Sequence, residues 1–176
     1  LDVYELRAPA VPAEAARGGR IARDVIIEVP TSAGSLDTDR IMIRPNPLQA
    51  EYLPEARWSE STPVMVQTLM LRSLEATNRL RYVGRRPLGA GGVVAVLTEI
   101  QDFQAELAPG SDRAEVHLRL RVTLVRESDA RILSTRTFAA RAAAASTKTL
   151  PLVEAFDAAA QEVLADFTVW AMANLR

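Results

Sequence analysis

The chain of 176 residues contains no cysteine, one histidine and one lysine. Without thiols it has no disulfide framework, no cysteine nucleophile and no cysteine ligands for zinc or an iron–sulfur cluster. The single imidazole, at His117, leaves too few strong ligands for a transition-metal site. We therefore expect no metal site and no cofactor.

Long apolar runs are also missing from the sequence. The densest run, Val93 to Leu97, falls far short of the roughly 18 to 20 residues that a helix needs to span a bilayer. A membrane-spanning helix is therefore not expected. The chain begins at Leu1 without methionine, as expected of a processed or trimmed form whose leader has been removed.

The charges nearly cancel, because 21 basic and 22 acidic residues leave a formal net charge of -1. A protein that neutralises the phosphates of nucleic acid needs a basic excess, so we expect no nucleic-acid partner. A hydrophobic fraction of 48% and a charged fraction of 24% are typical of a folded globular protein. The length predicts a single domain over residues 1–176.

Hydrophobic alternation predicts strands in the first third of the chain. A short strand is expected over residues 1–7, followed by a loop over the Ala- and Pro-rich residues 8–19. Residues 23–29 alternate as a half-buried strand, and residues 36–44 provide a partner for it, so the two are predicted to form a hairpin. A short extended segment is predicted over residues 49–53.

Two amphipathic helices and a meander follow. The first helix is predicted to begin with Thr62 as N-cap and Pro63 in the first helical position, and its apolar stripe continues to Leu80. The second helix opens near Thr149 and keeps helical spacing through Trp170.

Three strands between these helices, over residues 93–103, 115–126 and 131–140, predict an antiparallel meander. The first opens with apolar residues on both faces, which indicates a central position. The expected fold class is α+β, a mainly antiparallel sheet with two amphipathic helices packed on one face.

Candidates for catalysis are few. His117 lies on the polar face of its predicted strand, and nothing around it resembles the context of a serine nucleophile, so a sheet-face residue is favoured over a catalytic base. The stretch Gly89–Gly92 lacks the lysine and the glycine order of a phosphate-binding loop, and a strand follows it, so a flexible connection is favoured. We expect no catalytic, cofactor-binding or metal-binding residues.

Arginine supplies 20 of the 21 basic residues. Guanidinium groups can clamp phospholipid phosphates or partner carboxylates. The favoured interpretation is nevertheless a solvated sheet face balanced by the equal acidic count. The arginines concerned are Arg81, Arg85, Arg86, Arg119 and Arg121.

Large aromatic residues are scarce, and three of them stand out. Trp170 lies in the apolar stripe of the last helix, which predicts a core position. Tyr52 and Trp58 flank an extended segment before the first long helix. An aromatic there either staples the helix start to the sheet, which we favour, or presents a flat contact surface.

Several segments together carry a family resemblance. They are the opening Tyr4–Leu6, the segment Glu51–Trp58 running into the helical Pro63–Gln67, and the last helix with its Leu152–Ala159 pattern ending near Trp170. In these parts the chain resembles the ABC-type transport auxiliary lipoproteins, the PqiC-like outer-membrane partners of MCE-protein lipid transport systems. The resemblance spans nearly the whole chain and is sharpest over Glu51–Trp58.

The candidate partner-contact or family-motif residues are therefore Tyr52, Leu53, Arg57 and Trp58. The resemblance implies a signal peptide, a lipidated cysteine upstream of Leu1, and a position at the periplasmic face of the outer membrane. It implies an MCE-domain subunit and an ABC permease and ATPase as partners, with phospholipid as a further candidate and a homo-oligomer left open. This sequence lacks the cysteine, which a cut just after the anchor explains.

Three functions compete at this point. The leading hypothesis is a non-enzymatic periplasmic lipoprotein that docks onto a transport complex by strand-edge pairing or aromatic contact. The second is a lipid carrier that holds an acyl chain between sheet and helices. The third is an enzyme, for which His117 is the only plausible base.

Overall fold

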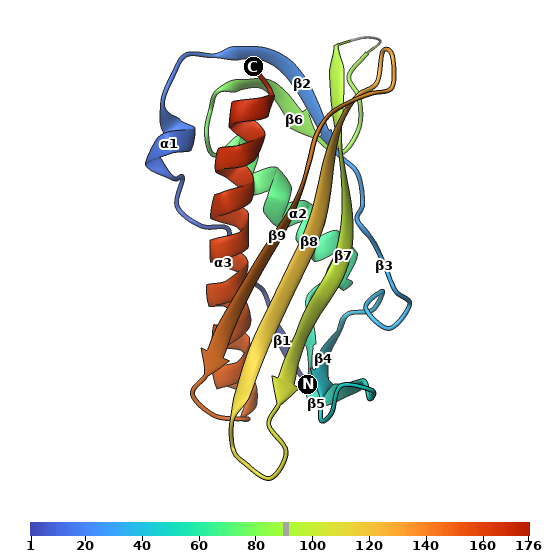
Figure 1. The fold of residues 1–176 in the computed structure, drawn as a ribbon, viewed down its shortest axis with the longest axis vertical. Coiled ribbons are helices and arrows are strands. Elements are labelled where there is room, and N and C mark those ends of the chain that lie inside the picture. The colour runs from blue at the N-terminus through green and yellow to red at the C-terminus, as the bar shows by residue number, and fades with distance from the viewer. Residues whose placement is uncertain (90–91) are drawn as a thin grey trace.

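The computed structural model describes residues 1–89 and 92–176, and within them nine strands and three helices form one mixed sheet with helices on one face (Figure 1). The strands are β1 (Asp2–Tyr4), β2 (Ile21–Ile27), β3 (Thr31–Ser32), β4 (Arg40–Arg44), β5 (Glu51–Trp58), β6 (Leu80–Gly84), β7 (Val93–Leu107), β8 (Ala114–Arg126) and β9 (Arg131–Ala144). The helices are α1 (Ala13–Ala16), α2 (Thr62–Glu75) and α3 (Thr149–Asn174). The predicted α+β class is confirmed.

Strands β7, β8 and β9 form the long antiparallel meander that the alternation predicts. β7 pairs with β8 from Val94 opposite Arg126 to Leu107 opposite Ala114, and β8 pairs with β9 over a similar length. Alternate residues of β8 are buried on the helix-covered side, as a half-buried strand requires. The pairings with the most residues in register are therefore antiparallel.

The opening of β7 is central, as its apolar residues on both faces predict. Residues 93–96 are all buried, because β2 flanks them on one side and β8 on the other. Strands β2, β3 and β4 lie one after another along the same edge of β7, each parallel to it, at residues 93–96, 99–100 and 105–106.

The predicted hairpin of residues 23–29 with residues 36–44 is wrong. β2 pairs in parallel with β6 and β7, whereas β4 pairs with β5 and β7. Val25, Ile26 and Ile27 are all buried, and such a continuous apolar run is typical of a parallel strand covered on both faces. The two segments follow each other along β7 and do not lie side by side.

Three further boundaries differ from the prediction. Short α1 lies within the expected loop 8–19, and β6 occupies residues that the apolar stripe assigned to the helix. α2 ends at Glu75, and Asn78 then adopts a positive φ of 53°, which turns the chain into β6. β5 continues through Pro54, where its pairing with β4 shifts in register.

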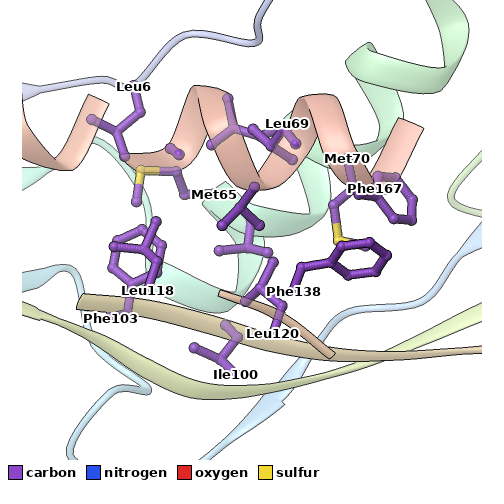
Figure 2. Packing of buried hydrophobic residues seen from close by; sticks show 14 of the residues in the cluster. Leu6, Met65, Leu69, Met70, Ile100, Phe103, Leu118, Leu120, Phe138 and Phe167 are labelled. Carbon is purple, nitrogen blue, oxygen red and sulfur yellow. The ribbon is translucent and has the colours of Figure 1, made fainter. Parts of the chain in front are cut away.

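Helices α2 and α3 cover one face of the sheet and enclose the core (Figure 2). α3 packs on β8 and β9, and α2 packs on α3, β2 and β6. Ser61 is the N-cap of α2, one residue before the predicted position, and the Thr62 hydroxyl donates to the Thr38 carbonyl at 3.1 Å. None of the helices in the described chain is both long and apolar enough to cross a membrane.

Aromatic side chains pack at two places along α3. Trp58 meets Phe103 and Phe156 edge-on, with ring centroids 6.2 and 5.2 Å apart. Farther along the helix, Phe138 lies against Trp170 at 5.3 Å and against Phe167 at 6.2 Å. Such pairs contribute about 0.5–1.5 kcal/mol each beyond the area they bury.

Candidate functional site

The segment of the sharpest resemblance forms strand β5, and the four candidate residues on it divide into two buried and two half-exposed side chains. Trp58 is 1% exposed within the first aromatic group, and Leu53 is also buried. Trp58 thus packs between Phe103 of β7 and Phe156 of α3, at the end of β5, and the expected staple to the start of α2 stays a prediction. The prediction that these two residues contact a partner directly is not tested, but any such contact would require them to leave the core.

Tyr52 and Arg57 are the half-exposed members of the set. The Tyr52 hydroxyl donates to the Ser35 carbonyl at 2.7 Å, and the Arg40 guanidinium lies 4.8 Å from the centre of its ring. Arg57 Nη1 donates to the Trp58 carbonyl at 2.9 Å and lies 3.6 Å from a carboxylate oxygen of Asp39. β1 pairs with this strand, so Tyr52 and Arg57 lie near the N-terminus.

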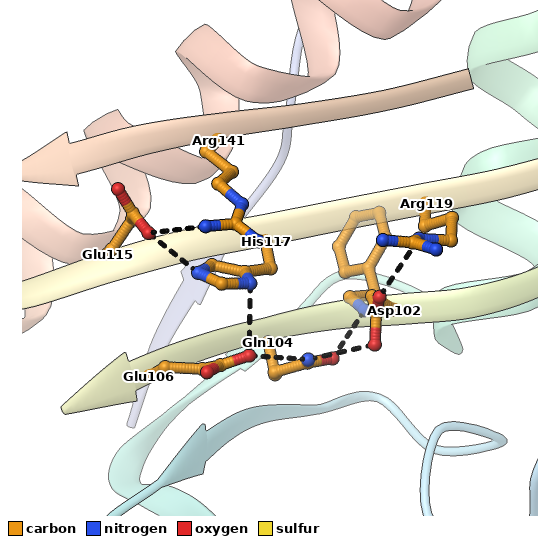
Figure 3. A network of polar contacts seen from close by, with 8 residues as sticks. Asp102, Gln104, Glu106, Glu115, His117, Arg119 and Arg141 are labelled. Carbon is orange, nitrogen blue, oxygen red and sulfur yellow. Dashed lines mark hydrogen bonds and ion pairs between the residues drawn. The ribbon is translucent and has the colours of Figure 1, made fainter. Parts of the chain in front are cut away.

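A polar cluster lies on the face of β7 and β8 that points away from the helices (Figure 3). His117 Nε2 lies 2.8 Å from a Glu115 oxygen, and His117 Nδ1 lies 3.1 Å from a Glu106 oxygen. Arg141 on β9 approaches the same Glu115 oxygen at 3.7 Å. Each ring nitrogen of His117 therefore faces a carboxylate.

The cluster continues along β7. Gln104 Nε2 donates to Asp102 at 3.0 Å and to Glu106 at 3.2 Å. Arg119 Nε lies 3.4 Å from the other Asp102 oxygen. The acidic groups of β7 thus face basic groups on the neighbouring strand β8, which matches the predicted balance of charge on this sheet face.

This arrangement suits structural pairing better than catalysis. A general base needs a free imidazole lone pair beside a substrate proton, whereas both nitrogens of His117 already have acidic neighbours. His117 lines a surface groove of about 420 Å³, and no serine or threonine is among the described residues that line it. Among the described residues, no group of three or more histidine, aspartate or glutamate side chains is placed to hold a metal ion.

The arginines singled out in the sequence do not come together in one place. Arg81 pairs with Asp24 at 2.8 Å, and Arg85 donates to the Thr68 hydroxyl at 2.7 Å. Arg121 lines a surface groove of about 340 Å³. The flexible connection expected at Gly89–Gly92 lies partly outside the described residues, because these exclude Ala90 and Gly91. A strand, β7, follows this stretch, as expected.

The strongest perturbations of acid groups lie in the turns of the meander. A hydrogen bond from Arg126 lowers the pKa of Asp129 to about 2, and the backbone amide of Arg131 adds to this effect. At the opposite end, the Thr147 hydroxyl and amide lower the pKa of Asp112. Both groups hold loops in place, so neither perturbation marks a reaction centre.

Sequence reasoning missed the partners of His117. Glu106 reaches it from β7, and Arg141 of β9 lies opposite it and pairs with Glu115, so the cluster depends on the register of three strands. Gln104 pairs directly with His117 in that register and is buried. The alternation of charged residues on all three strands was the available signal, but it does not say which residues lie opposite each other.

Comparisons with known proteins identify the fold. A crystal structure of a DUF330 protein from Xanthomonas campestris is similar to 98% of this chain and 95% of that chain, with a TM-score of 0.83 and 22% identity. An uncharacterized protein is similar over 99% and 95%, with a TM-score of 0.65 and 12% identity. PelC of Paraburkholderia phytofirmans, a dodecamer, is similar over 97% and 94%, with a TM-score of 0.50 and 11% identity. No curated protein sequence gives a significant match.

A family model described as "ABC-type transport auxiliary lipoprotein component" matches residues 4–167. The fold and this match together define an accessory component of a transport system, a role that suggests a non-enzymatic protein. More particularly, the chain belongs to the ABC-type transport auxiliary lipoprotein family. The family resemblance inferred from the sequence is thus confirmed, and lipoprotein membership is consistent with a location in the cell envelope.

Proposed function

We propose that the protein is a non-enzymatic periplasmic lipoprotein of an MCE-type ABC transport system that moves phospholipid or related hydrophobic molecules across the envelope. The observation that carries the proposal is the family match over nearly the whole chain. The open polar face and the structural pairing of His117 support a docking role over bond chemistry.

In this proposal a lipid on a cysteine upstream of Leu1 anchors the protein at the periplasmic face of the outer membrane. The two chain ends lie at opposite ends of the long axis (Figure 1). Leu48 is 96% exposed in the loop between β4 and β5, and Leu1 and Val3 are exposed as well. An anchor at the N-terminus would bring these apolar side chains toward the membrane and point the C-terminal end away from it.

The proposed contact for the MCE subunit is the half-exposed pair Tyr52 and Arg57 on β5. Tyrosine and arginine are enriched among the residues that dominate binding energy in protein interfaces. The buried Trp58 and Leu53 hold the strand from behind, so the exposed pair is presented by a fixed backbone. A rigid platform reduces the entropy lost on binding.

The packed interior favours docking over the alternative of a lipid carrier. Phe156 on α3 stacks on Phe103 of β7 at 5.6 Å, and Met70 on α2 is fully buried in the same core. An acyl chain between the sheet and helices would have to displace these contacts. Native mass spectrometry of freshly purified protein that showed bound lipid would favour the carrier instead.

The proposal is tested by co-purification of the full-length lipidated protein with the MCE subunit after mild detergent extraction. The wild type should retain the subunit, and the double variant Tyr52→Ala/Arg57→Glu should lose most of it. If the double variant still retained the MCE subunit, Tyr52 and Arg57 would not form the contact with it. Clean separation of the wild-type protein from the subunit would count against the proposal as a whole.

Strand β6 offers a matched control. Tyr82 is half-exposed and donates its hydroxyl to a backbone carbonyl, that of Arg86, as Tyr52 does to Ser35. Arg81 pairs with a carboxylate, as Arg57 does. The variant Tyr82→Ala/Arg81→Glu should therefore match the test variant in stability and charge while leaving co-purification intact.

A further inference from the structure

Four arginines line one groove at the end of the molecule that carries the C-terminus (Figure 1). The groove has a volume of about 480 Å³, within the range of small-ligand sites. It lies where the segment between α1 and β2 passes the turn between α2 and β6. The residues that line it are Arg17, Gly18, Gly19, Arg20, Ile21, Arg79 and Arg176, and none of them is acidic.

Arg79 is the buried member of this set, with 7% of its surface exposed. Its Nη1 donates to the Ala15 carbonyl at 2.8 Å, and its Nε donates to the Gly19 carbonyl at 3.1 Å. These bonds leave the Nη2 side of the guanidinium to face the groove lining. The guanidinium is thus fixed in orientation by the backbone that forms the wall of the groove.

Gly18 shows how closely the loop follows this side chain. The residue has a φ of +102°, a conformation that side chains rarely adopt, and a Cβ there would lie 2.6 Å from Arg79 Nη2. Glycine is therefore required by the backbone angle and by the approach of the guanidinium. The guanidinium of Arg79 therefore packs directly beneath the loop that lines the groove.

The charge of this groove is not balanced by the protein. Within residues 1–89 and 92–176, no ion pair involves Arg17, Arg20, Arg79 or Arg176, whereas Arg7, Arg81 and Arg126 each pair with an aspartate. A buried charge without a counter-charge is costly, so burial of Arg79 needs compensation. Two carbonyl groups supply part of it, and a bound anion would supply the rest.

We propose that this arginine groove binds a phosphate-type oxyanion, either the headgroup of an anionic phospholipid or a free phosphate compound. Guanidinium groups form paired hydrogen bonds to phosphate oxygens, and a phosphate monoester or diphosphate concentrates several negative charges in a small volume. Four arginines around one groove match that charge density better than the single charge of a carboxylate side chain. The inference stands on the groove alone and does not depend on the proposed transport role.

A purely structural role explains Arg79 but not its neighbours. Arg79 clips the α1 turn to the α2–β6 turn through two backbone carbonyls. Arg17, Arg20 and Arg176 are exposed, and like charges gathered around a fourth are unfavourable unless an anion screens them. A bound anion would explain why these three arginines lie around the same groove.

The test uses isothermal titration with pyrophosphate and flotation with vesicles of phosphatidylcholine with and without phosphatidate. The triple variant Arg17→Gln/Arg20→Gln/Arg176→Gln changes exposed residues only, so its fold should be retained. We expect it to lose at least about tenfold in affinity. The matched triple Arg113→Gln/Arg121→Gln/Arg131→Gln carries the same charge change elsewhere and should bind like the wild type.

The titration and the flotation distinguish a free phosphate compound from a lipid headgroup. Binding of pyrophosphate alone assigns a free phosphate ligand, and binding only to vesicles with phosphatidate assigns a lipid headgroup. The inference is overturned if the wild type binds neither probe, or if the two triples lose affinity equally.

Discussion

At the scale of single residues, Trp58 and Tyr52 show that two aromatic residues of the same strand can differ in burial and in role. Trp58 ends β5 inside the core, whereas Tyr52 remains at the surface with its hydroxyl bound to Ser35. The sequence places both aromatics before the first long helix and favours a staple to that helix, whereas the aromatic partners of Trp58 lie on β7 and α3. Tyr52 is left as the proposed contact.

The first prediction separates these tasks by stability. Trp58→Ala removes a buried ring from between Phe103 and Phe156 and should lower the free energy of unfolding by about 3–5 kcal/mol. Tyr52→Phe removes one hydrogen bond and should cost about 1 kcal/mol. Urea denaturation measures both. If both variants lost the same free energy of unfolding, the packing of Trp58 between Phe103 and Phe156 would not have the stabilising role assigned to it.

The second prediction concerns Asp129, whose pKa Arg126 lowers to about 2. Because the folded-state pKa lies below the ordinary value of about 3.9, the group stabilises the fold above pH ~4, and this stabilisation disappears as the pH falls toward 2. Asp129→Asn should be slightly less stable than the wild type at pH 7, since the pair is exposed, and equal to it near pH 2. A difference that is constant with pH would show that the charge of Asp129 does not contribute to stability.

At the scale of secondary-structure elements, local patterns predict some strands and not others. The meander of β7, β8 and β9 follows from alternation and short turns, because each strand pairs with its neighbour in sequence. Strands β2 and β4 do not pair with each other, since both add to the edge of β7 from a distance of many residues. Such long-range parallel pairing leaves no local signal in a single sequence.

β6 shows a second limit. Thr77 and Leu80 continue the helical spacing of α2 and are buried, so the apolar stripe extends past the true helix end. The turn at Asn78 decides the boundary, and asparagine is one of the few residues besides glycine that adopt a positive φ readily. The residue was visible in the sequence, but its backbone conformation was not.

The third prediction follows from the position of the strands in the sheet. β7 and the paired length of β8 are bonded on both sides, whereas β1 has three residues and pairs only with β5. Backbone amides in the middle of β7 and β8 should therefore exchange with deuterium most slowly, and those of β1 among the fastest in the sheet. Slow exchange in β1 equal to that of β8 would contradict this topology.

At the scale of the whole molecule, one cluster of buried hydrophobic residues runs from Leu6 to Leu175, and the single domain stays a prediction. The charge balance of the whole chain hides a local imbalance, because the arginine groove has no acidic lining residue. The composition therefore shows that the chain as a whole is not strongly basic, but it could not predict this groove. The two connecting segments and the C-terminal residue that form it meet only in the folded chain.

The fourth prediction tests whether the chain unfolds as one unit. Trp58 and Trp170 report on the two aromatic groups at different points along α3. In the single-tryptophan variants Trp170→Phe and Trp58→Phe, the fluorescence transition should coincide with the loss of far-ultraviolet circular dichroism. Separate midpoints within one variant would indicate independently folding parts.

The central claim is that this lipoprotein acts as a docking surface in a transport complex. The most direct measurement is photo-crosslinking in living cells with a benzophenone amino acid at position 52, compared with position 162 on the exposed side of α3. We predict that position 52 crosslinks to a subunit of the ABC transport complex and that position 162 does not. Equal crosslinking at both positions, or none to any transport subunit at position 52, would contradict the account.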